Sequence, residues 1–348
     1  MKKRVAIVGG GITGACAARR LAATAGAGTA IEVHLFDQGR RGVGGRTSSR
    51  TYQQRDGAYQ PSTSEESYVG AACTACTSHP QKLRFDHGCQ FFRADTPEFK
   101  RLAKEWIDKK YVAEWKGDFR SSGSATEDRH REFFGLPSSP PFYVAADGMQ
   151  SLPRNILNEL IEGTASDEGT TSSSSVVVRV HCGVRVAQME RDPSTERWRL
   201  FGQSGEAAYH DTSEQYVKGN TQRHLLGGDN QAGFDAVILT DVSSSFGAWH
   251  RASAGVPEGF ARRVRDRVGA RVPLMTAMVA FDRPTGVPFD AASFDHPVAW
   301  FAARTGSKPG MDTGRECWTV VSTPQCTMDR IGDLGRPGIS SRCRAPTF

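Results

Sequence analysis

The sequence contains no long hydrophobic run. None of its 348 residues lies in an apolar stretch that approaches the ~20 residues a helix needs to cross a bilayer. The first apolar segment begins at Val5, which leaves no room for a cleavable leader ahead of it. These absences predict a cytoplasmic protein with no membrane partner.

The sequence also lacks a concentrated basic tract and a regular cysteine spacing. Its 44 Lys and Arg residues only slightly outnumber its 38 Asp and Glu residues, which fits a protein that handles an anionic small molecule and does not indicate a nucleic-acid partner. The eight cysteines are irregularly spaced and do not indicate a disulfide framework. Cys73-x-x-Cys76-x-x-His79 resembles half of a metal site, but no second Cys/His pair follows at a suitable spacing, so no metal is expected.

What the sequence does contain, near its amino end, is a glycine-rich turn between an apolar strand and a helix. Val5–Val8 is a short β-branched run of the kind that forms a buried parallel strand. It leads into a G-x-G-x-x-G pattern on Gly9, Gly11 and Gly14, and residues 15–23 have the composition of a helix. In such a turn the first glycine makes the bend, the second lets backbone approach a pyrophosphate, and the third lets helix and strand pack closely.

The helix after this turn is expected to supply the phosphate contacts. The unpaired N–H groups of its first residues, including Ile12 and Thr13, favour negative charge. A second strand, Ile31–Asp37, ends at an acidic residue, where a carboxylate would accept the hydroxyls of an adenosine ribose. The alternative is a glycine turn followed by a solvated Asp, but the linked features together favour a dinucleotide site.

A second glycine motif follows this second strand. Gly44 and Gly45 permit close backbone approach and positive φ, and Arg46 can reach a diphosphate with its planar set of donors. Alone, this stretch would indicate a basic surface turn. Linked to the first motif it indicates FAD rather than NAD, because NAD-dependent Rossmann domains need only the first motif.

A third block, Asp86-His-Gly-Cys-Gln-Phe91, combines a glycine with polar and aromatic residues. Gly88 would allow the backbone to approach a flat ring, with the Gln90 amide and the Phe91 ring beside it. A buried strand with a satisfied His and Gln explains the same block equally well. His87 is the one candidate acid or base, and we expect a structural role for it.

The rest of the chain predicts an α/β fold that is large enough for two domains. Periodicity predicts helices at 97–106, 150–161 and 258–268, a hairpin of 185–190 with 197–201, and strands at 176–184, 234–240, 273–281, 298–303 and 317–322. Polar insertions are expected at 51–82, 163–175 and 202–232.

These elements predict a Rossmann-like FAD-binding domain and a second domain for the substrate. The FAD-binding domain is discontinuous and comprises residues 1–95 and 144–250. The substrate domain, residues 96–143 and 251–326, is expected to be α+β and built on a mostly antiparallel sheet. Residues 327–348 are expected to form an atypical tail.

Four blocks together resemble the renalase-like branch of the FAD-dependent amine-oxidase superfamily, a group of two-dinucleotide-binding flavoproteins. The blocks are Val5–Gly14, Gly44–Arg46, Asp86–Phe91 and Phe234–Thr240. The resemblance implies that FAD binds at Gly9, Gly11, Ile12, Thr13, Gly14, Asp37, Gly44, Gly45 and Arg46. It also implies that Gln90 and Phe91 lie near the redox-active ring, and that the backbone of Val184 touches the adenine side.

The resemblance further implies an oxidoreductase that takes a hydride from a reduced donor onto flavin N5 and passes the electrons to oxygen, which gives hydrogen peroxide. In the renalase branch the donors resemble isomers of dihydro-NAD(P), and in the wider superfamily they are amines, so both remain open. The expected partners are therefore a small-molecule substrate and molecular oxygen. Because the flavin carries the chemistry, no catalytic residue is nominated.

The carboxyl end departs from the family pattern. Flavoproteins of this type end with a strand, a Gly-Asp turn and a helix that faces the flavin. Gly332 and Asp333 are present here, but the sequence predicts neither an apolar strand before them nor a helix after them. This departure keeps a third hypothesis open, a nucleotide-binding protein without catalytic activity.

Overall fold

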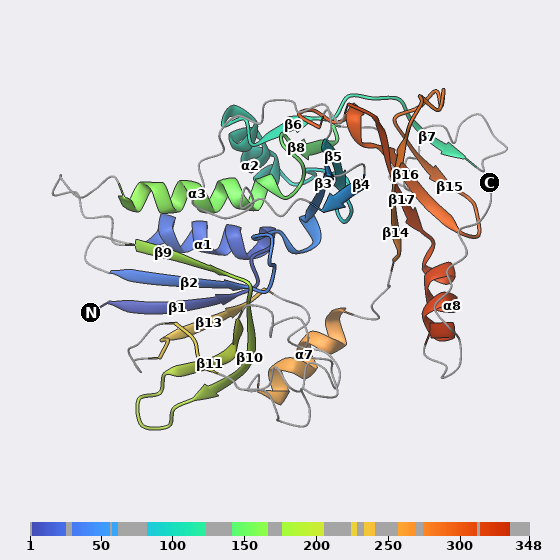
Figure 1. Ribbon diagram of the computed structural model, residues 1–348. Helices are drawn as coiled ribbons and strands as arrows, with labels where there is room; N and C mark the ends of the chain where they lie inside the picture. Colours follow the sequence, from blue (N-terminus) through green and yellow to red (C-terminus); the bar gives the residue numbers. More distant parts are fainter. Residues whose placement is uncertain are drawn as a thin grey trace.

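The computed structural model describes residues 2–25, 30–55, 58–61, 82–122, 141–165, 176–204, 224–227, 233–240, 257–268, 274–311 and 314–334. A parallel sheet and a mostly antiparallel sheet lie at opposite sides of the molecule, with helices and short strands between them (Figure 1). The carboxyl ends of the parallel strands point toward the second sheet (Figure 1).

The parallel sheet has the strand order β13-β1-β2-β9. Its strands are β1 (Lys3–Val8), β2 (Ile31–Asp37), β9 (Val176–Cys182) and β13 (Ala236–Leu239). Helices α1 (Ile12–Thr24) and α3 (Ser151–Ala165) cover one face (Figure 1). The predicted Rossmann-like α/β fold is therefore confirmed.

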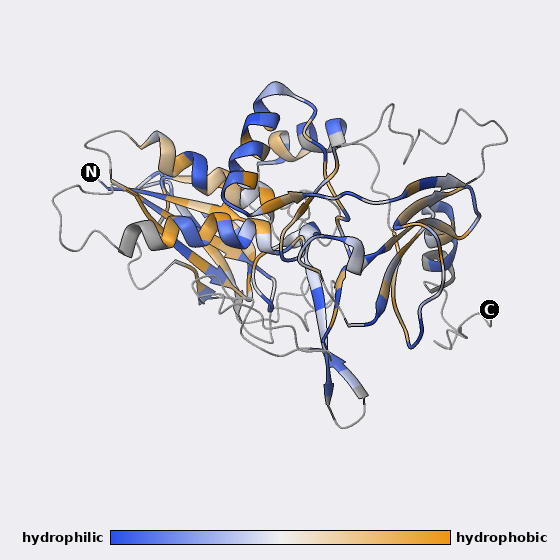
Figure 2. Ribbon diagram, turned by 90° about the horizontal axis from the view of Figure 1, so that it is seen from above, coloured by the Kyte–Doolittle hydropathy of each residue, from blue (hydrophilic) through white to orange (hydrophobic). Residues whose placement is uncertain are grey.

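Both faces of this sheet are buried, which explains why β1 is apolar throughout its second half. Side chains alternate between the two faces of a strand. Ile7 and Leu35 lie in the core with α1 and α3, whereas Val8 and Phe36 pack against Leu200 on the opposite side. Hydrophobic residues are accordingly concentrated in these strands and on the inner faces of the helices (Figure 2).

The layer opposite the helices is an antiparallel sheet of β10 (Val184–Arg191), β11 (Trp198–Ser204) and β12 (His224–Leu225). The pairing of β10 with β11 confirms the predicted hairpin. Gly183, with a φ of 66°, divides the single strand predicted at 176–184 into β9 and β10. Strands β11 and β12 lie partly within the insertion predicted at 202–232, of which 205–223 and 228–232 fall outside the described residues.

The second sheet has the strand order β14-β17-β16-β15-β7. Its strands are β7 (Phe119–Ser122), β14 (Thr276–Phe281), β15 (Ala291–Phe294), β16 (Ala299–Arg304) and β17 (Glu316–Ser322). Neighbours are antiparallel except β15 and β7, which are parallel. The three strands predicted in this region are confirmed, whereas the short β15 was not predicted.

Short elements connect the two large sheets. Strands β3 (Ser49–Arg55), β4 (Ala58–Pro61) and β5 (Lys82–Asp86) form one small sheet, and β6 (Val112–Glu114) pairs with β8 (Tyr143–Ala145) beside helix α2 (Pro97–Asp108). The first part of the insertion predicted at 51–82 therefore forms strands, and 62–81 fall outside the described residues. Tyr52 packs against Phe85 across the strands, and this tertiary contact outweighs the polar local composition.

Two further helices are α7 (Glu258–Val268) and α8 (Pro324–Leu334). Helix α8 begins just after β17 and includes the first residues of the tail predicted at 327–348, with Gly332 and Asp333 in its last turn, whereas 335–348 lie outside the described residues. Thr323 caps this helix by accepting the N–H of Cys326 at 3.1 Å, and Pro324 occupies its first position. This start signal was overlooked in the sequence. Helix α3 similarly continues to Ala165, inside the insertion predicted at 163–175.

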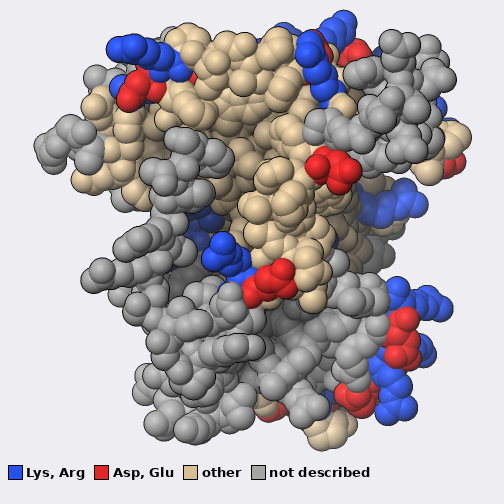
Figure 3. Space-filling model, turned by 90° about the vertical axis from the view of Figure 1, so that its right-hand side faces the viewer, with Lys and Arg blue, Asp and Glu red and all other residues tan. Residues whose placement is uncertain are grey.

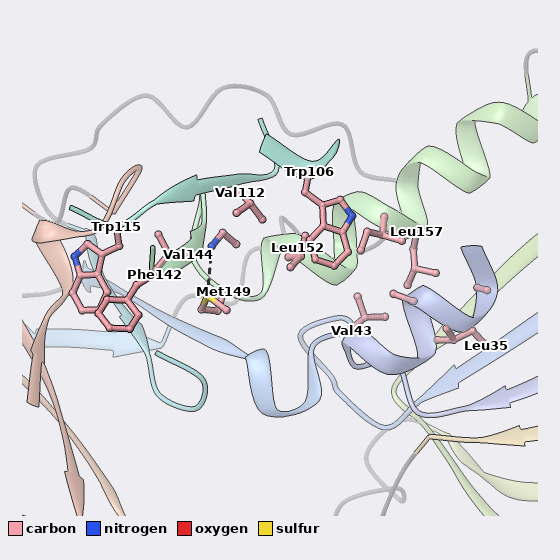
Figure 4. Packing of buried hydrophobic residues seen from close by; sticks show 14 of the residues in the cluster. Leu35, Val43, Trp106, Val112, Trp115, Phe142, Val144, Met149, Leu152 and Leu157 are labelled. Atoms are coloured by element: carbon pink, nitrogen blue, oxygen red, sulfur yellow. Dashed lines mark hydrogen bonds between the residues drawn. The ribbon is translucent and has the colours of Figure 1, made fainter. Parts of the chain in front are cut away.

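One hydrophobic cluster extends from the parallel sheet to the second sheet. Figure 4 shows its members in order, from Leu35 beneath α1, past Trp106 and Met149, to Trp115 near the second sheet. Phe301 of β16, which is fully buried, belongs to the same cluster. The two sheets therefore share buried side chains, and the division of the chain into two domains stays a prediction.

Candidate functional site

The glycine-rich turn lies at the carboxyl end of β1, where the backbone N–H of Gly9 donates to the carbonyl of Phe36 at 2.8 Å. Gly11 is the N-cap residue of α1 and supplies no side-chain hydrogen bond to the helix. The N–H groups of Ile12 and Thr13 therefore begin a helix whose amino end has no side-chain cap, and its first turn contains no acidic residue. Such an end attracts an anion.

Gly14 provides the closest helix–strand contact in this turn. A Cβ atom at Gly14 would lie 2.0 Å from the carbonyl oxygen of Gly9. The close packing predicted for the third glycine is thus observed. Thr240, at the end of β13, donates its hydroxyl to the carbonyls of Val8 and Gly9 at 2.9 Å each. The sequence interpretation missed this contact, although Thr240 ends a block that it had singled out.

The two glycine motifs meet backbone to backbone. The N–H of Gly44 donates to the carbonyl of Gly10 at 3.0 Å, and Gly11 and Gly44 form an isolated parallel bridge. Gly45 and Arg46 open the short 3-10 helix η1 (Gly45–Thr47) beside this bridge. The Arg46 side chain is exposed and has no hydrogen-bond or ion-pair partner among the described residues. The turn that carries the exposed Arg46 is therefore joined to the uncapped end of α1 by backbone contacts.

Asp37 is buried at the end of β2, and its carboxylate accepts backbone N–H groups. One oxygen accepts from Gly10 and the other from Gly39, at 2.6 Å each. In this structure Asp37 fixes the shape of the glycine loop, while its contact with a ribose stays a prediction. Cys182 lies opposite Asp37 in the sheet, and burial, followed by the Asp37 charge, raises the pKa of its thiol to about 12.

Val184 lies close to this end of β2. The N–H of Gly183, one residue before it, donates to the carbonyl of Gly39 at 3.2 Å. The structure thus brings Val184 to the loop that follows Asp37, the region in which the resemblance expects the adenine side. The contact with adenine itself stays a prediction.

The block of residues 86–91 begins at the end of β5 and packs on η1. A Cβ atom at Gly88 would lie 2.1 Å from the carbonyl oxygen of Arg46, which also accepts the N–H of Cys89 at 2.8 Å. Gly88 is therefore needed for the approach of the Arg46 backbone, whereas the sequence had suggested a flat ring. Burial, followed by the Arg50 charge, lowers the pKa of His87. Its Nδ1 atom is buried without a partner among the described residues.

Gln90 and Phe91 face the interior between the two sheets. The Gln90 amide donates to the carbonyls of Asp86 and Gly88, and its oxygen accepts from Lys308 at 3.1 Å. The Phe91 ring lies 4.8 Å from that of Phe142, between ring centroids, and belongs to the aromatic cluster near Trp115 and Phe301. Both side chains are thus held by the protein, and their proximity to a flavin ring stays a prediction.

A cavity of about 610 Å³ lies on the second sheet, away from the glycine loop. Its lining includes Phe281, Ser307 and Arg304, whose guanidinium pairs with Asp290 at 2.5 Å. On the face of the molecule turned toward the viewer in Figure 3, uncharged side chains cover most of the described upper part, and acidic and basic side chains lie near its centre as well as at its edges.

Among the described residues, no helix is long and apolar enough to span a bilayer. The same residues hold no group of three or more His, Cys, Asp and Glu side chains that could bind a metal ion. Cys73, Cys76 and His79 lie outside the described residues.

The fold and the glycine loop define a protein with a Rossmann-like dinucleotide-binding domain. The family model of the NAD(P)-binding Rossmann-like domain matches residues 7–106, which contain both glycine motifs and the block at 86–91. No curated protein matches the sequence.

Solved structures resemble this chain at low sequence identity. An oxidoreductase from Methanosarcina mazei is 10% identical with a TM-score of 0.50, over 95% of this chain and 82% of that one. A putrescine oxidase variant with redesigned cofactor binding is 11% identical with a TM-score of 0.49, over 96% and 78% of the two chains. A reduced UDP-galactopyranose mutase is 10% identical with a TM-score of 0.44, over 92% and 74%. At these identities the first comparison supports the fold alone.

Proposed function

We propose that this chain is an FAD-dependent oxidoreductase, specifically an oxidase of reduced nicotinamides of the isomeric dihydro-NAD(P) class. The observation that carries the proposal is the backbone contact between the two glycine motifs, from Gly44 to Gly10. This contact adds a free arginine to a Rossmann turn that could otherwise serve NAD alone. The name of the M. mazei oxidoreductase agrees with a redox function for this fold.

The residues around the glycine loop fit the diphosphate of a dinucleotide. A Cβ atom at Gly11 would meet nothing closer than the carbonyl oxygen of Gly44 at 3.5 Å, so the approach to the amino end of α1 is open. In our proposal the N–H groups of Ile12 and Thr13 hold the diphosphate and the exposed Arg46 pairs with it. The buried Nδ1 of His87, without a partner among the described residues, offers a further polar contact near η1.

Bound at this site, the flavin would supply hydride acceptance from the donor and electron transfer to oxygen, with hydrogen peroxide as product. The protein's own contribution is to hold and orient the cofactor. Asp37 keeps the glycine loop in shape through Gly10, and the Gly88–Cys89 backbone supports Arg46 from the other side.

The test is the visible spectrum of the purified protein after incubation with FAD and removal of free cofactor. We expect bound oxidised flavin that bleaches anaerobically with isomeric dihydro-NAD(P) and yields peroxide in air. Bleaching by amines alone would contradict the substrate class, and bound flavin that nothing bleaches would indicate a nucleotide-binding protein without activity.

A matched pair of arginine variants tests the site. Arg46→Ala removes the guanidinium beside the loop, and we expect about tenfold weaker FAD binding, as for loss of one charge-assisted hydrogen bond. Arg101→Ala removes the same charge from an exposed position on α2, where the side chain is 75% accessible, and should bind FAD as the parent does. Equal affinity of both variants would refute the role of Arg46.

A further inference from the structure

A buried lysine from the second sheet contacts the loop that supports Arg46. Lys308 follows the short 3-10 helix η6 (Thr305–Ser307) in the connection between β16 and β17. Its side chain is only 1% exposed, and its ammonium lies 3.1 Å from a carboxylate oxygen of Asp86, which is equally buried. A charge so deeply buried is retained only where partners surround it.

Among the described residues, the hydrogen-bond partners of the Lys308 ammonium both belong to the segment 86–90. Besides Asp86, the ammonium donates to the amide oxygen of Gln90 at 3.1 Å. The ring of Trp115 lies on another side, with its centroid 5.3 Å from the nitrogen. The ammonium therefore joins the first and fifth residues of the 86–90 segment to each other.

Asp86 in turn accepts hydrogen bonds from several parts of the chain. Its second carboxylate oxygen accepts the hydroxyl of Ser49 at 2.7 Å and the N–H of Met149 at 2.8 Å. Its carbonyl accepts the Gln90 amide and the hydroxyl of Thr319 at 3.2 Å. Residues of β3, β17 and the turn that precedes α3 thus hold the segment at one end.

The same segment touches the candidate cofactor site at its middle. Cys89 donates to the Arg46 carbonyl, and Gly88 lies against it. Gly44, two residues before Arg46, bonds to Gly10 of the glycine loop. A continuous series of contacts therefore leads from Lys308 through residues 86–90 to the turn that carries Arg46.

We propose that Lys308 is a positioning residue that fixes the 86–90 segment, and through it the Arg46 turn, for cofactor binding. The cofactor part of this inference rests on the proposed function. The claim that Lys308 fixes the 86–90 segment does not depend on a cofactor. Lys308 acts by closing the segment on Asp86 and Gln90, and it does not need to touch the cofactor.

The test compares Lys308→Met with the double variant Lys308→Met/Asp86→Asn. The single variant leaves a buried carboxylate without its cation, so it should unfold at lower urea concentration than the parent. The double variant carries no unpaired charge and keeps acceptors for Ser49 and Met149, so most of the stability should return. In both variants Gln90 has lost the donor that held its amide oxygen.

Hydrogen exchange of the protein without cofactor provides the first readout. We expect the Cys89 amide to exchange about tenfold faster in the double variant, with exchange in β1 and β2 unchanged. FAD affinity provides the second readout. We expect both variants to bind FAD about tenfold more weakly than the parent, although the double variant regains most of the parent's stability. Lys104→Met, at a side chain that is 75% exposed, should change neither quantity.

The two readouts separate the inference from the proposed function. Unchanged exchange at Cys89 in the double variant would overturn the positioning role. Faster exchange with FAD affinity equal to that of the parent would overturn the link to the cofactor site. A parent protein that binds no FAD would refute the proposed function, while the exchange result would still decide whether Lys308 fixes the segment.

Discussion

Substitution of Gly14 by alanine tests the close contact between α1 and the end of β1. The added Cβ would lie 2.0 Å from the Gly9 carbonyl oxygen, a backbone atom, so it must move by about 1 Å to reach even the 3.0 Å limit of real contacts. Overpacking of this kind typically destabilises by about 1–3 kcal/mol. Replacing a helical glycine by alanine contributes about 0.5–1 kcal/mol in the opposite direction. We therefore expect a net loss of about 1–2 kcal/mol in the free energy of unfolding.

Gly259→Ala is the matched control for this variant. Gly259 lies in helix α7, is exposed, and has nothing within 4 Å of its Cβ position. At this position only the higher helix propensity of alanine acts, so the free energy of unfolding should rise by up to about 1 kcal/mol. Urea unfolding gives both free energies, and FAD titration should show weaker binding for Gly14→Ala only. If the two variants were equally stable and bound FAD equally well, the reasoning about this contact would be refuted.

Three further predictions concern single residues. Gly88→Ala should destabilise by about 1–3 kcal/mol in urea unfolding, because its Cβ would lie 2.1 Å from the Arg46 carbonyl oxygen; parental stability would contradict this. Burial lowers the pKa of His34 to about 4, compared with 6.5 in the unfolded chain. The neutral His34 therefore contributes fully to the free energy of unfolding above pH 6.5, and this contribution is lost as the pH falls from 6.5 through 4. The parent should lose up to about 3 kcal/mol more than His34→Gln over this range, and parallel stability curves would argue against it. Cys182 should resist alkylation at neutral pH until the protein unfolds, as mass spectrometry can determine, since its thiol pKa is raised to about 12.

The parts of the fold that local pattern controls could be predicted from the sequence. Val5–Val8 is apolar because both faces of β1 are buried, and the glycines after it have the spacing that a strand–turn–helix imposes. The pairing of β10 with β11 follows from alternation around a turn. Each of these features is determined by residues close together in the chain.

The parts that depend on distant contacts could not be predicted in this way. Tyr52 lies in a polar stretch that forms a strand by pairing with β4 and with β5, which follows about 30 residues later in the chain. Asp86 and Lys308 are 222 residues apart, and neither has a local pattern that would indicate the other. Gly88 was correctly singled out as a point of close approach, but the approaching group, the Arg46 backbone, became evident only from the structure.

The most direct test of the central claim is a crystal structure of the protein grown with FAD. We predict that the diphosphate lies within hydrogen-bond distance of the N–H groups of Ile12 and Thr13, with the Arg46 guanidinium beside it. A cofactor bound elsewhere, or a glycine loop closed by neighbouring side chains in the presence of saturating FAD, would contradict the account.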